Sequence, residues 1–136
     1  MCGLKSVEVY DHAEDSWSHM PNMIVGRRDH RLVPIRNKLY AVAGELCESP
    51  MQSTEVFDLV SNKFVILKPP PLSFQFDFSY LKGAVSMKNK ILLISDCRPP
   101  VAWFDVEEQK WSEEDVDIDC GEELCEKNCC FKIPHV

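Results

Sequence analysis

Short apolar runs bounded by turn-forming residues make up most of the chain. Two clear examples are Leu39-Tyr40-Ala41-Val42-Ala43 and Ile91-Leu92-Leu93-Ile94, each opened by an Asn-Lys pair. Runs of this length suit strands, and no stretch shows a capped, amphipathic helical stripe. Their continuous apolar character indicates strands that are buried on both faces. We predict strands near residues 7–10, 30–35, 39–43, 54–57, 64–67, 83–87, 91–95, 101–104 and 110–112.

An internal repeat runs through these predicted strands. Its first element is Val7-Glu8-Val9-Tyr10-Asp11, which returns as Thr54-Glu55-Val56-Phe57-Asp58 and Val101-Ala102-Trp103-Phe104-Asp105. Tyr10, Phe57 and Phe104 are 47 residues apart at each step (57 − 10 and 104 − 57). A second aromatic follows each of them seven positions later: Trp17, Phe64 and Trp111. Because the aromatics keep the repeat period, we expect them to pack at equivalent positions instead of forming a ligand-stacking surface.

The repeat also contains a change of length. Asn37 and Asn89 are 52 residues apart (89 − 37), so five extra residues precede Asn89, and we place them around Pro69-Pro70-Pro71 and Phe74 to Phe78. Each unit then holds about four strands in roughly 50 residues, which is the size of a propeller blade. We divide the chain into the end of a preceding blade, two blades and an acidic, Cys-rich tail: residues 1–23, 24–71, 72–117 and 118–136.

Together these motifs resemble the kelch repeat. Besides the repeated aromatics, Arg27-Arg28-Asp29-His30 resembles the Arg-x-x-His opening of a kelch blade. The resemblance implies an all-β fold of kelch-type β-propeller blades, with about two and a half four-stranded antiparallel blades in an incomplete ring. The structural repeat positions would be Tyr10, Trp17, Gly44, Phe57, Phe64, Phe104 and Trp111.

One kelch feature is only partly kept. Kelch blades usually end their second strand in a double glycine, which permits a turn with positive φ. Here Ala43-Gly44 keeps one glycine and Ser95-Asp96 keeps none. Because Asp tolerates the left-handed region moderately, we expect the turn at Ser95-Asp96 to survive with some strain.

The net charge and the motif content argue against several classes of function. The net charge of −7 argues against broad nucleic-acid binding, and no apolar run reaches the ~20 residues that a membrane-spanning helix needs. No catalytic motif occurs, and the four histidines do not share a metal-ligand spacing. The cysteines at 120, 125, 129 and 130 lack the paired spacing of a zinc site, so free thiols are favoured over zinc binding or redox sensing. We expect no catalytic residue, no metal, no cofactor and a loosely ordered tail.

The resemblance implies a protein-interaction module in the cytoplasm. Kelch-like proteins join an upstream dimerisation domain to a complete propeller and act as substrate-recognition adaptors of cullin-based E3 ubiquitin ligases, and some bind actin. The partner would then be a ubiquitination substrate or actin, and a full-length protein would carry that upstream domain and further blades. A degenerate or truncated kelch fragment is the second hypothesis, and a propeller enzyme is a third. The candidate partner-binding residues are Arg27, Arg28, Glu45, Cys47, Arg98 and Trp103, mostly in or near the loops after each second strand.

Overall fold

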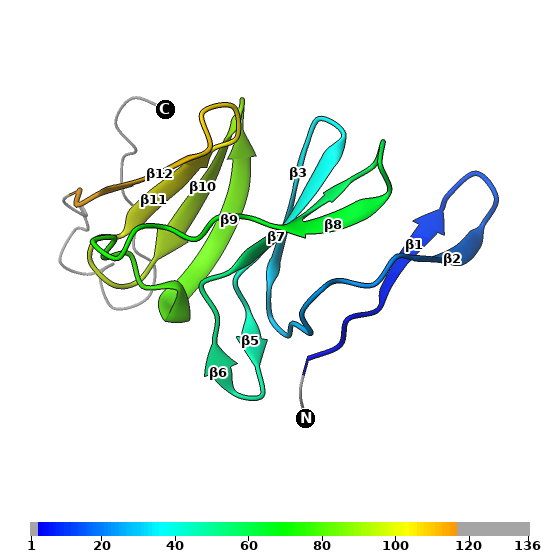
Figure 1. Cartoon of the computed structure of the whole chain (residues 1–136), viewed down its shortest axis with the longest axis horizontal. Coiled ribbons are helices and arrows are strands. Elements are labelled where there is room, and N and C mark those ends of the chain that lie inside the picture. Colours follow the sequence, from blue (N-terminus) through cyan, green and yellow to red (C-terminus); the bar gives the residue numbers. More distant parts are fainter. Residues whose placement is uncertain (1–2, 117–136) are drawn as a thin grey trace, which may run out of the picture. The chain divides into compact units, whose positions relative to one another are not determined.

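The computed structural model describes residues 3–116, which form two compact units (Figure 1). The first unit ends at Pro69 and the second begins at Pro70. This division falls within the Pro69-Pro70-Pro71 run, whose missing N–H donors disfavour a central strand. The sequence division placed the corresponding boundary between residues 71 and 72.

The first unit contains a hairpin followed by a four-stranded antiparallel sheet. The hairpin pairs β1 (Val7–Asp11) with β2 (Ser16–Met20). The sheet has the order β3-β4-β7-β8, and a small hairpin, β5-β6, lies between β4 and β7 in the chain (Figure 1). The bounds are β3 Arg31–Ile35, β4 Lys38–Val42, β5 Glu45–Leu46, β6 Ser49–Pro50, β7 Thr54–Asp58 and β8 Lys63–Ile66.

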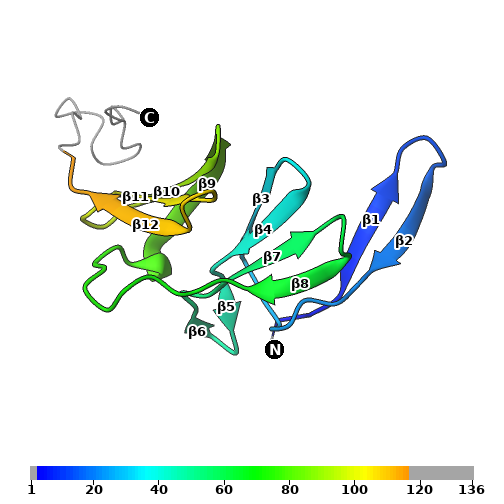
Figure 2. The ribbon, with the colours of Figure 1, turned by 45° about the horizontal axis from the view of Figure 1, so that its top comes forward.

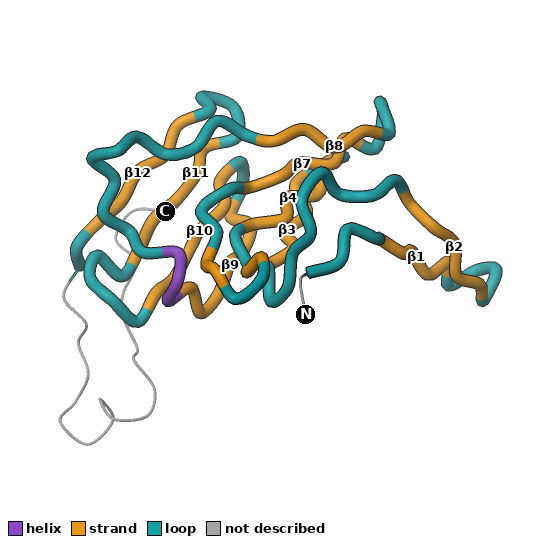
Figure 3. The backbone as a smooth tube through the Cα atoms, turned by 60° about the horizontal axis from the view of Figure 1, so that its bottom comes forward, coloured by secondary structure: helices purple, strands orange, loops and turns teal. Residues whose placement is uncertain are grey.

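The second unit repeats the sheet with one additional element. A short 3-10 helix, η1 (Phe78–Tyr80), leads into a four-stranded antiparallel sheet of order β9-β10-β11-β12 (Figure 2). The bounds are β9 Leu81–Met87, β10 Lys90–Ser95, β11 Val101–Asp105 and β12 Lys110–Glu114. The all-β class with four-stranded antiparallel sheets is confirmed, and η1 is the only helix within residues 3–116 (Figure 3). The strand list omitted β2 and the short β5-β6 hairpin, because neither carries an apolar run.

The residues that recur every 47 positions form the same hairpin turn in each repeat. Asp11, Asp58 and Asp105 each end a strand, and each carboxylate accepts hydrogen bonds from the backbone N–H groups two and three residues later. Such a side chain closes the turn locally, as Asx turns do. The residue four positions after each aspartate has positive φ: Asp15, Asn62 and Gln109.

The aromatic pairs repeat with the turns. Tyr10 lies opposite Trp17, Phe57 opposite Phe64, and Phe104 opposite Trp111 in the strand register. Their ring centroids are 5.2, 4.9 and 4.8 Å apart, with interplanar angles of 45–47°. Phe57 and Phe104 are buried, whereas Tyr10 and Trp17 are exposed.

The turn after the second strand differs between the sheets, and the expectation for Ser95-Asp96 was wrong. In the first sheet Ala43 and Gly44 have φ of 55° and 96°, and a Cβ at Gly44 would lie 2.8 Å from the Arg28 carbonyl oxygen. Neither Ser95 nor Asp96 has positive φ. A register shift at Ile94/Ser95 and a loop five residues shorter (Ser95 to Val101 against Ala43 to Thr54) replace the left-handed turn.

Candidate partner-binding loops

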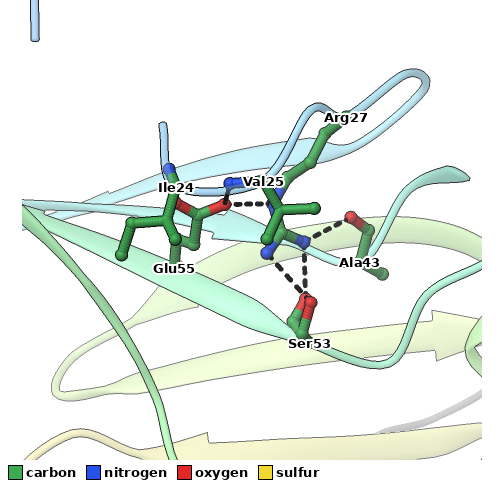
Figure 4. A network of polar contacts seen from close by, with 6 residues as sticks. All are labelled: Ile24, Val25, Arg27, Ala43, Ser53 and Glu55. Atoms are coloured by element: carbon green, nitrogen blue, oxygen red, sulfur yellow. Dashed lines mark hydrogen bonds and ion pairs between the residues drawn. The ribbon is translucent and has the colours of Figure 1, made fainter. Parts of the chain in front are cut away.

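A buried ion pair holds the segment that precedes the first sheet (Figure 4). The Arg27 Nε donates to the Glu55 carboxylate at 2.8 Å, and neither side chain is exposed to solvent. The same carboxylate accepts the backbone N–H groups of Ile24 and Val25. A buried charge is tolerated only when it is paired and its hydrogen bonds are satisfied, and Glu55 on β7 meets both conditions.

The guanidinium of Arg27 also fixes the loop after β4, residues 43–53, which we call the first loop. Arg27 Nη1 donates to the carbonyl oxygens of Ala43 at 2.8 Å and Ser53 at 2.7 Å, and Nη2 donates to Ser53 Oγ. Both ends of the first loop are therefore tied to one buried side chain (Figure 4). The part between them, which contains β5 and β6, projects from the sheet as a small hairpin (Figure 1).

In the second sheet, a different carboxylate binds the segment that precedes the sheet. Ala102 stands where Glu55 stands in the first sheet, and the carboxylate instead comes from Glu113, the cross-strand neighbour of Ala102. Glu113 Oε2 accepts the backbone N–H groups of Gln75 at 2.8 Å and Phe76 at 2.7 Å. In the first sheet the neighbour of Glu55 is Ile66, so the carboxylate has moved from the inner to the outer strand of the pair.

The arginine is replaced as well. Phe78 follows the second bonded amide by two residues, as Arg27 does in the first sheet, and its side chain is buried. Its ring lies 5.3 Å from Phe76 and 5.8 Å from Trp111, in edge-to-face arrangements that aromatic rings favour. Phe74 lies 5.9 Å from Trp111 on the same cluster. An aromatic cluster thus covers the hairpin of the second sheet, in place of the buried ion pair.

Exposed charges lie at the base of the first loop. Arg28 and Glu45 exchange two backbone hydrogen bonds, of 3.0 and 2.8 Å, and their side chains form an ion pair at 2.7 Å. The hydrogen bond from Glu45, followed by its charge, raises the pKa of the Arg28 guanidinium. Both side chains remain more than a third exposed, so a partner can reach them.

His30 lies near this loop and is half-buried. Burial, followed by the positive charge of Arg27, lowers the pKa of the His30 imidazole from its ordinary value of 6.5. His30 is therefore neutral at physiological pH.

The second sheet carries a comparable set of charges around the loop of residues 95–100, which we call the second loop. Arg98 donates from Nε to Asp115 at 2.7 Å, and Lys82 pairs with Asp96 at 3.2 Å. An open pocket of about 450 Å³ adjoins this loop and is lined by Gln75, Arg98, Pro99, Glu113 and Asp115.

The candidate residues chosen from the sequence fall into three environments. Arg28, Glu45, Cys47 and Arg98 are in or beside the two loops, where their residues are exposed or partly exposed. Arg27 is 3% exposed, so it is a structural residue and is unavailable to a partner. Trp103 is half-buried, opposite Leu92 and Ser112 in the register. Sequence reasoning missed Glu55 and Glu113, whose partners are 28 to 38 residues away.

Residues 3–116 hold neither a metal-binding cluster nor a membrane-spanning helix. No group of three or more His, Cys, Asp or Glu side chains is placed to hold a metal ion there. No helix in that range is long and apolar enough to cross a membrane. The cysteine cluster from Cys120 to Cys130 and the tail prediction lie outside the described residues.

Comparison with known proteins agrees with these repeated sheets. A model of the Kelch motif matches residues 1–24. Kelch-like protein 7 of Rattus norvegicus is 34% identical over 68 residues, which are 50% of this chain and 12% of that protein. Kelch-like protein 15 of Gallus gallus is 27% identical over 134 residues, covering 90% of this chain and 26% of that protein. The chain thus spans only 12–26% of the length of these curated relatives.

The repeated four-stranded sheets with matching turns and aromatic pairs define a class, the kelch-type propeller blades. Within that class, the chain is similar to kelch-repeat proteins of the kelch-like family.

Proposed function

We propose that this chain belongs to the substrate-recognition part of an adaptor for a cullin-based E3 ubiquitin ligase that acts in the cytoplasm. The observation that carries the proposal is the first loop, whose two ends are anchored on Arg27 while its charged side chains stay exposed. In the proposal, a full-length protein also holds an upstream dimerisation domain and further blades, and the partner is the protein to be ubiquitinated.

Anchoring matters for binding because it lowers the entropy lost when a loop becomes ordered against a partner. Arg28 and Glu45 can then offer hydrogen bonds in fixed directions, and charged pairs of this kind contribute mainly to specificity and association rate. The second loop offers Arg98 and Asp115 in the same way, beside its open pocket. None of these side chains is arranged for acid–base or nucleophilic chemistry, which supports recognition over catalysis.

The test exchanges charges while keeping the ion pairs. Arg28→Glu combined with Glu45→Arg preserves the first pair but inverts its pattern, and Arg98→Asp combined with Asp115→Arg does the same at the second loop. Lys63→Glu, an exposed residue at the opposite end of the first sheet, is the matched control. The tagged full chain and each variant would be expressed in cells, and co-purifying proteins quantified by mass spectrometry.

The proposal expects a set of proteins whose recovery falls at least tenfold with a loop variant and is unchanged with the control. It also expects a cullin to be recovered with the unchanged chain, and the recovered proteins to lose ubiquitin when the loop variant replaces it. Loop-dependent partners without a cullin would refute the adaptor role. Co-sedimentation with actin filaments that requires Arg28 and Glu45 would establish actin binding instead, and no loop-dependent partner would favour a fragment without independent activity.

A further inference from the structure

Glu55 and Glu113 bind the same kind of backbone segment but differ in their cationic partner. Glu55 accepts two adjacent backbone N–H groups and, in addition, the Nε of Arg27 at 2.8 Å (Figure 4). Glu113 also accepts two adjacent backbone N–H groups, at 2.8 and 2.7 Å. No cationic side chain within residues 3–116 forms an ion pair with Glu113. The second sheet therefore keeps the carboxylate and the amides of the first sheet without its guanidinium.

The open pocket beside the second loop lies directly against this carboxylate. Its five lining residues, which include Glu113 and Asp115, all belong to the second unit. Arg98 is the one cationic residue of the lining, and its Nε already donates to Asp115 at 2.7 Å. The lining thus holds two carboxylates and one guanidinium. Because the charge of Arg98 is offset by Asp115, the carboxylate of Glu113 gives the pocket a negative charge that favours a cation.

The first sheet indicates which cation suits such a carboxylate. There the guanidinium of Arg27 pairs with Glu55 and also donates to both ends of the first loop. A guanidinium has five N–H donors in a planar fork, which can bind two acceptors at once, whereas a lysine ammonium is a compact and strongly hydrated charge. A volume of about 450 Å³ is in the range of small-ligand pockets, so it has room for one long side chain. An arginine is therefore favoured over a lysine.

We propose that this pocket binds an arginine side chain of the partner protein. The incoming guanidinium donates to Glu113 and to the side of Asp115 that Arg98 does not occupy, which is feasible because a carboxylate offers about four lone-pair sites. This inference rests on the proposed function, since it names the chemistry by which the second loop recognises its partner. The side chains of Arg98 and Asp115 are 59% and 57% exposed, so a partner can reach the pocket from solvent.

The backbone amides that Glu113 binds report on the pocket directly. The isotope-labelled full chain is titrated with N-acetyl-arginine N-methylamide and with the matching lysine and citrulline compounds, and NMR follows the amide signals of Gln75 and Phe76. Citrulline has nearly the size of arginine but no charge. Glu113→Gln removes the charge and keeps an oxygen acceptor for the two amides. Glu108→Gln, at an exposed position in the turn between β11 and β12, is the matched control.

The proposal expects saturable shifts of the Gln75 and Phe76 signals with the arginine compound, and clearly weaker binding of the lysine and citrulline compounds. Glu113→Gln should weaken arginine binding by about tenfold, the size expected for a hydrogen bond to a charged group. Asp115→Asn should also weaken it, and Glu108→Gln should not. Equal binding of the three compounds, no binding, or binding that survives Glu113→Gln would overturn the proposal. Shifts of the same signals on raising the protein concentration alone would overturn it too, because a second copy would then fill the pocket.

The co-purification experiment separates this inference from the proposed function. Proteins that are lost with the charge exchange at the second loop should also be lost with Glu113→Gln and retained with Glu108→Gln. If loop-dependent partners and a cullin are recovered but Glu113→Gln leaves them unchanged, the adaptor role stands and the arginine pocket is refuted. If the arginine compound binds as expected but no cullin is recovered, the pocket stands and the adaptor role is refuted.

Discussion

Removal of the Glu55 carboxylate is the most informative perturbation of the fold. In Glu55→Ala, the Arg27 guanidinium stays in the interior without a counter-charge, and the N–H groups of Ile24 and Val25 lose their acceptor. Breaking a fully buried ion pair from one side costs about 3–5 kcal/mol. Because a small domain is stable by only about 5–15 kcal/mol, this loss is a large fraction of the total.

Urea denaturation followed by circular dichroism measures the effect. With a slope of about 2 kcal/mol per molar urea, typical of a small protein, the midpoint for the first unit should fall by roughly 2 M. Hydrogen exchange of the β7 amides then shows whether the loss is confined to the first sheet. The matched change in the second unit is Glu113→Ala, which removes two backbone hydrogen bonds from a partly exposed carboxylate and should cost only about 1–3 kcal/mol.

A double variant separates the charge from the loss of packing. Adding Arg27→Met to Glu55→Ala removes the unpaired charge and should recover part of the stability, because apolar replacements of buried ion pairs are often well tolerated. If Glu55→Ala lowers the free energy of unfolding by less than about 0.5 kcal/mol, the reasoning is refuted, since surface substitutions have effects of that size. So would a double variant that is less stable than Glu55→Ala alone.

Three further predictions follow from the described contacts. Gly26→Ala places a Cβ 2.2 Å from the Gly3 carbonyl oxygen, so the backbone must shift, and the melting temperature and exchange protection of the Arg27 amide should both fall. Phe57→Ala should cost about 3–5 kcal/mol in urea denaturation, while the same change at exposed Tyr10 should cost well under half as much. Because the folded-state pKa of His30 lies below its unfolded value of 6.5, the unfolded chain binds the proton more readily, so stability should fall as pH drops through 6.5. His30→Gln should flatten that part of the pH profile, and an unchanged profile would contradict the assignment.

The sequence alone determined the repeated hairpins of this protein. Asp58 and its turn partners lie within three residues of one another, and Phe57 meets Phe64 across the same turn. Contacts between residues this close in the chain produce a fixed spacing in the sequence, because every repeat needs the same residue types at the same offsets. The period therefore predicted the four-stranded antiparallel sheets and the resemblance to kelch blades, although the predicted strands did not include β2, β5 or β6.

Only the tertiary structure decided which side chains hold each sheet to the segment before it. Glu55 and Glu113 do equivalent work from neighbouring strands, and their partners Arg27 and Phe78 share no chemistry. No spacing in the sequence predicts which of the two strands carries the carboxylate. The backbone amides need a carboxylate at one point in space, and either of two opposed residues in an antiparallel pair can place it there. The burial of Arg27, which turned a candidate binding residue into a structural one, follows from the same fact. Arg27 lies 28 residues from Glu55, so the packing of the whole sheet brings the two side chains together. The local sequence pattern does not predict that packing.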